Sequence, residues 1–220
     1  MRLVFDVRLE RTVAMKILRP DAVAPTLSAR FLAEIQLTAG LDHPGIVPVY
    51  DYGALSDGRL WFTMAEVRGR TLRTVLDEAF AAPGGVSSVV RRRLLDVFAR
   101  VCDAVAYAHS RGVIHRDLKP DNIMVGDFGR VLVMDWGIAR RLDARPEDPQ
   151  GPPSPERFEH RVDGLTRYGD VLGTPAYMAP EQARGDVGRH GPKTDVYALG
   201  AILYYALSGR PPYTGQGAAG

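Results

Sequence analysis

The stretch that decides the fold runs from residue 115 to residue 122: His115-Arg116-Asp117-Leu118-Lys119-Pro120-Asp121-Asn122. An eight-residue pattern of this kind is specific, because the probability that an unrelated sequence contains it by chance is negligible. Three further segments accompany it along the chain, one before it and two after it. They are Val13-Ala14-Met15-Lys16, Asp135-Trp136-Gly137 and Ala179-Pro180-Glu181.

These four segments, in this order, match the signature set of protein kinases. The chain therefore resembles the Hanks-type (eukaryotic-like) Ser/Thr protein kinases, particularly the bacterial branch, over nearly all of its 220 residues. The resemblance implies a two-lobe α+β fold, with a small antiparallel sheet and one helix in residues 1–67 and a mainly helical lobe in residues 68–220. It also implies transfer of the γ-phosphate of ATP to Ser or Thr hydroxyls of proteins.

The composition excludes little by itself. Hydrophobic residues make up 45% and charged residues 25% of the chain, which is ordinary for a soluble globular protein. A net charge of +2 argues for neither nucleic-acid nor membrane binding. No apolar run approaches the roughly 20 residues of a membrane span, and the single cysteine, Cys102, fits a reducing compartment. We expect a cytoplasmic domain, although the full-length gene could carry a membrane anchor beyond this chain.

Apolar periodicity and turn residues predict a sheet-rich first part and a helical second part. The stretch after Asp135, rich in proline and charge, is predicted to be a disordered loop at 143–161. The predicted strands cover residues 3–6, 12–18, 46–52 and 60–67, with two short strands around a turn at 126–129. The predicted helices cover residues 29–41, 71–80, 89–111 and 194–208.

The resemblance implies a nucleotide site around Lys16, which would pair the α- and β-phosphates of ATP while Glu34 on a helix holds it in place. Either residue alone would ordinarily be a surface side chain. The adenine ring is expected between apolar residues, all of which would also be unremarkable in a plain core. Ala14 and Met124 would sandwich the ring, Met64 would be the gatekeeper, and Ala65 and Val67 would offer backbone groups.

By the same resemblance Asp117 is the catalytic base that accepts the proton of the substrate hydroxyl. Lys119 steadies the transferring phosphate, and the Lys119-Pro120 pair favours Ser/Thr over Tyr substrates. Asn122 is expected to be a metal ligand. Hard oxygen ligands combined with phosphates suit Mg²⁺, with Mn²⁺ as a possible substitute.

Two aspartates compete for the role of second metal ligand. Asp127-Phe128-Gly129 has the usual letters of the family, but Asp127 follows Asn122 by only five residues. That is too few for a strand, a turn and a returning strand. Asp135 follows Asn122 by thirteen residues, which accommodates such a hairpin. We therefore expect Asp127 to be a turn residue and Asp135 to bind the metal, with Trp136 packing beneath the helix of Glu34.

Residues 135–181 resemble an activation segment. Thr174 is expected to bond to the catalytic loop, and Arg116 is the arginine that in this family meets a phosphorylated residue. Asp170 stands where that phosphosite usually lies, and its carboxylate could pair with Arg116 without phosphorylation. The alternatives are an exposed loop aspartate at 170 and, as a weaker phosphosite, Thr166.

Two carboxylates after the activation segment have expected structural roles. Asp195 matches the buried aspartate that anchors the catalytic-loop backbone, although a helix N-cap is an alternative and the two roles could coexist. Glu181 is expected to be buried without its usual arginine partner. Such an unpaired charge would cost on the order of 3–5 kcal/mol.

The sequence carries no Gly-rich phosphate loop ahead of Val13, and it stops shortly after the last apolar helix. We expect a catalytic domain cut short at both ends, so a catalytically weak binding or scaffolding module is the alternative function. A small-molecule phosphotransferase is a remoter alternative, against which Arg116 and the Ala-Pro-Glu segment argue. Expected partners are protein substrates and, for autophosphorylation, a second copy of the chain.

Overall fold

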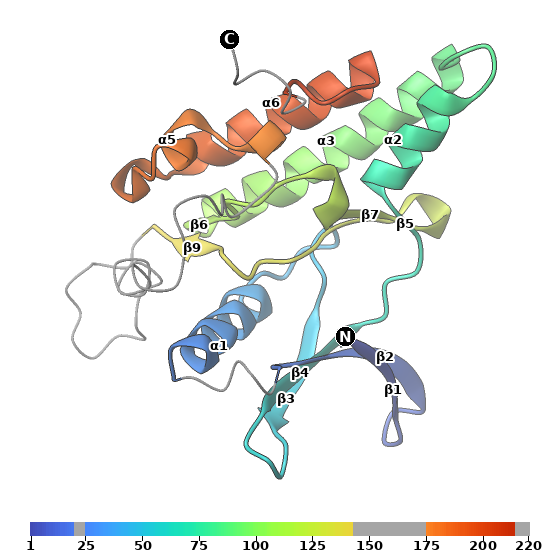
Figure 1. Cartoon of the computed structure of the whole chain (residues 1–220). Helices are drawn as coiled ribbons and strands as arrows, with labels where there is room; N and C mark the ends of the chain where they lie inside the picture. Colours follow the sequence, from blue (N-terminus) through green and yellow to red (C-terminus); the bar gives the residue numbers. More distant parts are fainter. Residues whose placement is uncertain (20–24, 143–174, 214–220) are drawn as a thin grey trace.

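The computed structural model describes residues 1–19, 25–142 and 175–213. One end of the molecule is an antiparallel sheet with strand order β1-β2-β4-β3, against which helix α1 packs. Figure 1 shows this sheet at the opposite end of the molecule from the long helices. The bounds of these elements are β1 Arg2–Asp6, β2 Arg11–Ile17, α1 Pro25–Ala39, β3 Val49–Ala54 and β4 Leu60–Ala65.

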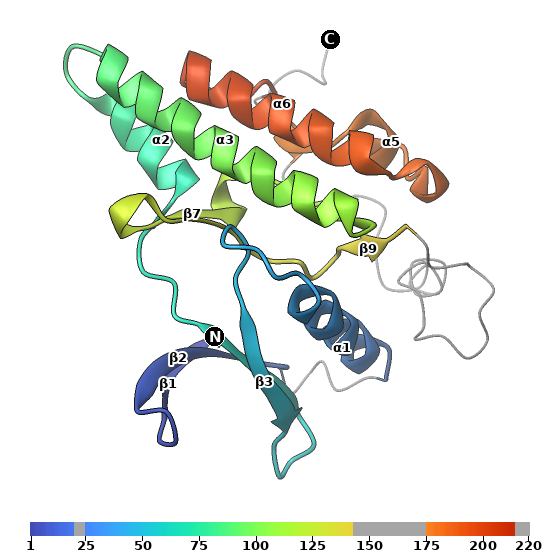
Figure 2. The same ribbon diagram turned by 180° about the vertical axis from the view of Figure 1, so that it is seen from behind.

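The other end is helical. Helices α3 and α6 lie side by side in both views, and the hairpin β7–β8 lies between them and the four-stranded sheet (Figures 1 and 2). The helices are α2 Leu72–Ala81, α3 Ser88–Ser110, α5 Pro180–Ala183 and α6 Pro192–Ser208. The short strands are β5 Arg70–Thr71, β6 Val113–Ile114, β7 Ile123–Val125, β8 Val131–Val133 and β9 Arg140–Arg141. Together the two ends form the α+β fold that the sequence predicts.

Each end has its own buried apolar cluster. Alternate residues of β4 point to α1, so that Phe62 and Met64 are buried with Phe31 and Ile35 of the helix. The rings of Phe31 and Phe62 lie 5.3 Å apart. In the helical end, α2, α3 and α6 bury the second cluster, which includes Leu76, Val101, Val105, Ile202 and Tyr205.

Most predicted elements are present, with shifted ends. Helix α1 begins at Pro25, four residues before the predicted start. The third strand is predicted to start at residue 46, but β3 begins at Val49, because Ile46 instead forms an isolated parallel bridge with Val133. The amide of Val133 also donates to Gly45 O at 2.8 Å. These bonds fasten β8 to the segment that follows α1. The predicted loop at 143–161 lies outside the described residues.

A search of the described residues finds no helix with the length and apolar character that crossing a membrane requires.

The connection between the two ends depends on Gly69, whose φ is +146°. A Cβ at this position would lie 2.4 Å from Val125 O, which is backbone and cannot rotate away. Gly58 offers a matched comparison, since its φ is +82° but a Cβ added there would have no atom within 4 Å.

We expect Gly58→Ala to lower the free energy of unfolding by about 1–2 kcal/mol through left-handed strain alone. Gly69→Ala adds a backbone clash and should cost at least about 2 kcal/mol more. Urea unfolding of both variants measures the difference. Equal losses would contradict the close approach of residue 69 to β7.

Candidate active site

Lys16 brings three separate elements together. Its Nζ on β2 donates to Glu34 Oε1 of α1 at 2.5 Å. The same Nζ lies 3.8 Å from Asp135 Oδ1, just after β8. A single ammonium group therefore faces two carboxylates, one from the helix and one from the end of the β7–β8 hairpin.

Glu34 is 9% exposed, and burial raises the pKa of its carboxyl. The ammonium of Lys16 opposes that effect by attraction and hydrogen bonding, whereas the nearby Asp135 carboxylate adds to it. On balance the pKa of Glu34 stays raised, so Lys16 offsets the effect of burial only in part.

Asp135 has a φ of +60°, an uncommon conformation for a residue other than glycine. Gly137 leaves room beside it, because a Cβ there would make tight contacts of 3.2 Å with Asp135 Oδ1 and 3.3 Å with Glu34 Oε2. Asp127, by contrast, lies in the exposed turn between β7 and β8. The hairpin predicted from spacing is therefore present, and of the two aspartates it is Asp135 that lies near Lys16.

Trp136 is 1% exposed and forms part of the helical-end core. Its indole N–H donates to Val133 O at 3.3 Å, and its ring lies 4.6 Å from that of His115. Leu37 of α1 packs against the same cluster, while the packing of Trp136 itself beneath this helix stays a prediction.

The carboxylate of Asp117 is held by two neighbours in its own loop. Lys119 Nζ donates to Asp117 Oδ2 at 2.8 Å, and Asn122 Nδ2 donates to the same oxygen at 3.0 Å. The Asn122 amide also donates to Asp117 O at 2.8 Å. Both hydrogens of the Asn122 amide group thus point at Asp117, which leaves the amide oxygen as the atom that could bind a cation.

His115 is fully buried and fixes the start of this loop. Its Nδ1 accepts from the backbone N–H of Asp117 at 3.2 Å, and its Nε2 lies 3.0 Å from Met134 O. Because Nδ1 accepts and Nε2 faces a carbonyl, the arrangement requires a neutral ring with its proton on Nε2. The histidine therefore links the catalytic loop to the residue preceding Asp135.

Asp195 in the first turn of α6 is 1% exposed and anchors the loop backbone. Its Oδ2 accepts from the N–H of His115 and its Oδ1 from the N–H of Arg116, each at 2.8 Å. His109 Nε2 lies 2.7 Å from Oδ2. The N-cap alternative is wrong, because α6 begins at Pro192 and its N-cap is Gly191.

Burial by itself would raise the pKa of Asp195, but the bond to His109 and the bonds from the two backbone amides outweigh it and lower the pKa. These bonds also hold Arg116 at a φ of +67°, a conformation that costs free energy unless its surroundings impose it.

Arg116 is itself buried, and its Nε donates to Ile138 O at 2.6 Å. Gln182 of α5 donates to Arg116 O at 2.7 Å. The expected partners in the activation segment, Thr166, Asp170 and Thr174, lie outside the described residues.

The expectation of a buried, unpaired Glu181 is wrong. The side chain is only partly buried, and its Oε1 accepts from the hydroxyl of Thr194 at 2.8 Å. Although partial burial works to raise the pKa of Glu181, its own backbone N–H and the Thr194 hydroxyl lower it overall. A hydroxyl on α6 thus satisfies the carboxylate.

The residues expected around adenine are only partly brought together. Ala14 on β2 is paired with Met64 on β4, and both are buried with Ala65 in one cluster, against which Val67 packs. The N–H of Ala65 donates to a backbone carbonyl 3.1 Å away, so only its own carbonyl could serve a ligand. Met124 lies outside this cluster, on β7.

Sequence reasoning missed two residues that support the catalytic loop, His109 and Gln182. His109 is the basic residue of the last turn of α3, and Gln182 follows Glu181 directly. Neither has a local signal, because each contacts residues that are distant in the sequence.

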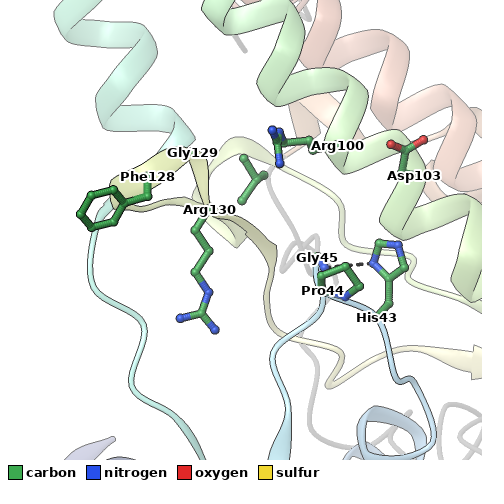
Figure 3. Close-up of a pocket in the computed structure, with 9 residues that line it drawn as sticks. His43, Pro44, Gly45, Arg100, Asp103, Phe128, Gly129 and Arg130 are labelled. Atoms are coloured by element: carbon green, nitrogen blue, oxygen red, sulfur yellow. Dashed lines mark hydrogen bonds between the residues drawn. The ribbon is translucent and has the colours of Figure 1, made fainter.

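A pocket of about 470 Å³ opens elsewhere, between the loop after α1, helix α3 and the β7–β8 turn (Figure 3). His43, Arg100, Phe128 and Arg130 are among its lining residues. None of the predicted site residues lines it. The catalytic candidates are therefore gathered around Lys16 and Asp117, outside this pocket.

We expect Asp195→Asn to lower the free energy of unfolding at pH 7 by about 2–4 kcal/mol, since an amide cannot accept from both backbone N–H groups. Because the folded pKa of Asp195 is lowered, its stabilisation is complete above about pH 4, the unfolded value, and is lost as the pH falls through the folded value. The difference between wild type and variant should therefore shrink below about pH 4.

Urea unfolding between pH 7 and pH 2 measures that difference, with Asp96→Asn on the exposed face of α3 as the matched control. A loss no larger than that of the control would contradict the anchoring role.

The comparisons with known proteins agree with this geometry. The chain matches the family described as Protein kinase domain over residues 2–219. It is 40% identical over 96% of its length to the serine/threonine-protein kinase PknD of Protochlamydia amoebophila, and covers 22% of that protein. It is 39% identical over 96% of its length to the serine/threonine-protein kinase PknB of Mycobacterium tuberculosis, and covers 30% of that one.

The chain thus spans between about a fifth and a third of the length of these curated relatives. The match nevertheless includes almost every residue of this sequence, with all four motifs and the described geometry around them. The chain belongs to the protein kinase family.

Proposed function

We propose that this chain is the catalytic core of a protein serine/threonine kinase that transfers the γ-phosphate of ATP to hydroxyls of proteins. The observation that carries the proposal is the Asp117 carboxylate, held at 2.8 Å by Lys119 and at 3.0 Å by Asn122. One short loop then contains a base, Asp117, a cation for phosphate, Lys119, and an amide oxygen that could bind a metal ion, that of Asn122. The Lys16, Glu34 and Asp135 cluster supplies the second half of the site.

In the proposed reaction the substrate hydroxyl oxygen forms a bond to the γ-phosphorus, and the bond from that phosphorus to the β-γ bridging oxygen breaks to release ADP. The hydroxyl proton passes to Asp117. Lys119 neutralises charge on the transferring group, and Lys16 neutralises charge on the α- and β-phosphates. Glu34 keeps the Lys16 ammonium in position, because it pairs with it at 2.5 Å.

Protein kinases use ATP with a divalent metal ion. Among the described residues no group of three or more His, Cys, Asp or Glu side chains could hold a metal by itself. We propose Mg²⁺, with Mn²⁺ as a substitute, because Mg²⁺ binds through one or two protein oxygens together with phosphates and waters. Asp135, whose side chain is 55% exposed, would supply its carboxylate. Asn122 would supply its amide oxygen.

Several finer expectations support the same function and remain proposals. The apolar cluster of Ala14, Met64 and Ala65, with Val67 and Met124, would hold adenine. Residues 1–67 and 68–220 would form the two lobes. An Asp170–Arg116 pair would order the activation segment without phosphorylation, with Thr166 as the weaker, phosphorylatable alternative. Thr174 would bond to Asp117 and Lys119. A cytoplasmic location and autophosphorylation between two copies are proposed as well.

We expect Asp117→Asn to lower phosphorylation of a Ser/Thr protein substrate by about 10²–10⁴-fold, since an amide cannot accept the hydroxyl proton. Transfer of ³²P from labelled ATP to a general substrate such as myelin basic protein measures the rate. Asp96→Asn, which removes an exposed carboxylate from α3, is the control and should leave the rate unchanged. Equal rates for wild type and Asp117→Asn would sink the kinase proposal.

A further inference from the structure

Arg73 on α2 forms a hub of contacts beside the catalytic loop. Its Nη2 lies 3.4 Å from Asp121 Oδ2 and 3.1 Å from the hydroxyl of Tyr177. Its guanidinium carbon lies 5.1 Å from the ring centre of Tyr205 and 5.7 Å from that of Tyr177. One arginine thus connects α2, the catalytic loop, the segment before α5, and α6.

Asp121 belongs to the same loop as the proposed base. It stands directly before Asn122, whose amide donates to the Asp117 carboxylate. Tyr177 ends the short 3₁₀ helix Pro175–Tyr177, three residues before α5 begins. The Arg73 hub therefore joins the loop of the proposed base to the segment that precedes α5.

The charged pair of this hub is open to solvent. The side chain of Asp121 is 46% exposed and that of Arg73 is 27% exposed. Burial raises the pKa of Tyr177 to about 12, against the opposing charge of Arg73, so this hydroxyl stays neutral near pH 7. Tyr205 donates its own hydroxyl to Asp77. In the part of the chain that the structure describes, the guanidinium of Arg73 is the cation that meets Asp121.

Residues on either side of a phosphorylated hydroxyl can reach this pair. An extended peptide advances about 3.3–3.6 Å per residue, so residues two to four positions away lie about 7–14 Å from the hydroxyl. This distance is comparable to the Debye length at about 0.1 M salt, roughly 10 Å, so solvent ions only partly screen the charges of these flanking residues. A basic residue of the substrate would be attracted by a free Asp121, but it meets a carboxylate that Arg73 already neutralises.

Resting on the kinase function proposed above, we propose that Arg73 determines the charge preference for protein substrates. It pairs with the Asp121 carboxylate and so withdraws this carboxylate from basic residues beside the phosphorylated Ser or Thr. The substrate class is therefore Ser/Thr segments that need no basic neighbours. Arg73 acts here through charge and does not take part in phosphoryl transfer.

Peptide binding tests this proposal without requiring catalysis. Two fluorescein-labelled peptides carry one central Ser, flanked on both sides by three Glu in one peptide and by three Arg in the other. Fluorescence anisotropy at about 10 mM ionic strength, where the Debye length is about 30 Å, gives the ratio of their dissociation constants. For wild type, in which the Arg73–Asp121 pair has no net charge, we expect the two dissociation constants to agree within about twofold.

Four variants separate the causes. Arg73→Gln should favour the Arg peptide by about two- to fivefold, the range of an exposed ion pair, because it frees Asp121. Arg73→Lys keeps the charge and should keep the wild-type ratio. The double variant Arg73→Gln with Asp121→Asn should bind both peptides equally. Arg100→Gln, which removes the same charge from the pocket in Figure 3, should leave the ratio unchanged.

Thermal unfolding of each variant establishes that it is folded. If Arg73→Gln does not fold, Asp121→Asn in the wild-type background retains a test, because it should leave the Arg peptide bound no more tightly than the Glu peptide. A wild-type preference for the Arg peptide, or a ratio that Arg73→Gln alters no more than Arg100→Gln does, would overturn the proposal. Phosphorylation of the two peptides is measured separately against Asp117→Asn. The expected shift of the ratio without any phosphorylation would count against the kinase function alone.

Discussion

The site depends on the position of one ammonium group, that of Lys16, between the carboxylates of Glu34 and Asp135. Lys16 lies on a strand, and its two partners come from a helix and from the end of a hairpin. These three elements must therefore be correctly positioned relative to one another for the ammonium group to have both partners. An ionised carboxyl as buried as Glu34 is costly without a counter-charge. The same constraint explains Gly137, since any side chain there would approach both carboxylates.

A second buried charge, Asp195, holds the other half of the site. Its carboxylate accepts hydrogen bonds from the backbone N–H groups of His115 and Arg116. The ring of His115 in turn bonds to the carbonyl of Met134, next to Asp135. The catalytic loop and the segment that carries Asp135 are thus connected through one neutral imidazole. The contacts of Arg73 with Asp121 extend this arrangement to the surface that would receive a protein substrate.

Local patterns predicted much of this arrangement. The spacing from Asn122 correctly placed Asp127 in a turn and Asp135 after a hairpin, because the lengths of short strands and turns vary within a narrow range. The predicted start of α1 was wrong. The predicted start of β3 was also wrong, because Ile46 pairs with Val133, more than eighty residues away in the chain. The contacts of Arg73, His109 and Thr194 could not be predicted either. Each is an ordinary residue of a helix, and its role comes from partners that only the tertiary fold brings near it.

We propose that the metal-dependent nucleotide site is built at Asp135 beside Lys16 and not at the Asp-Phe-Gly of the β7–β8 turn. Calorimetric titration of ATP with and without Mg²⁺ distinguishes these two positions, using wild type, Asp135→Asn and Asp127→Asn. We expect Mg²⁺ to strengthen ATP binding to wild type and to Asp127→Asn alike, and we expect Asp135→Asn to lose at least about tenfold of that gain. A loss confined to Asp127→Asn, or a full Mg²⁺ effect in Asp135→Asn, would contradict it.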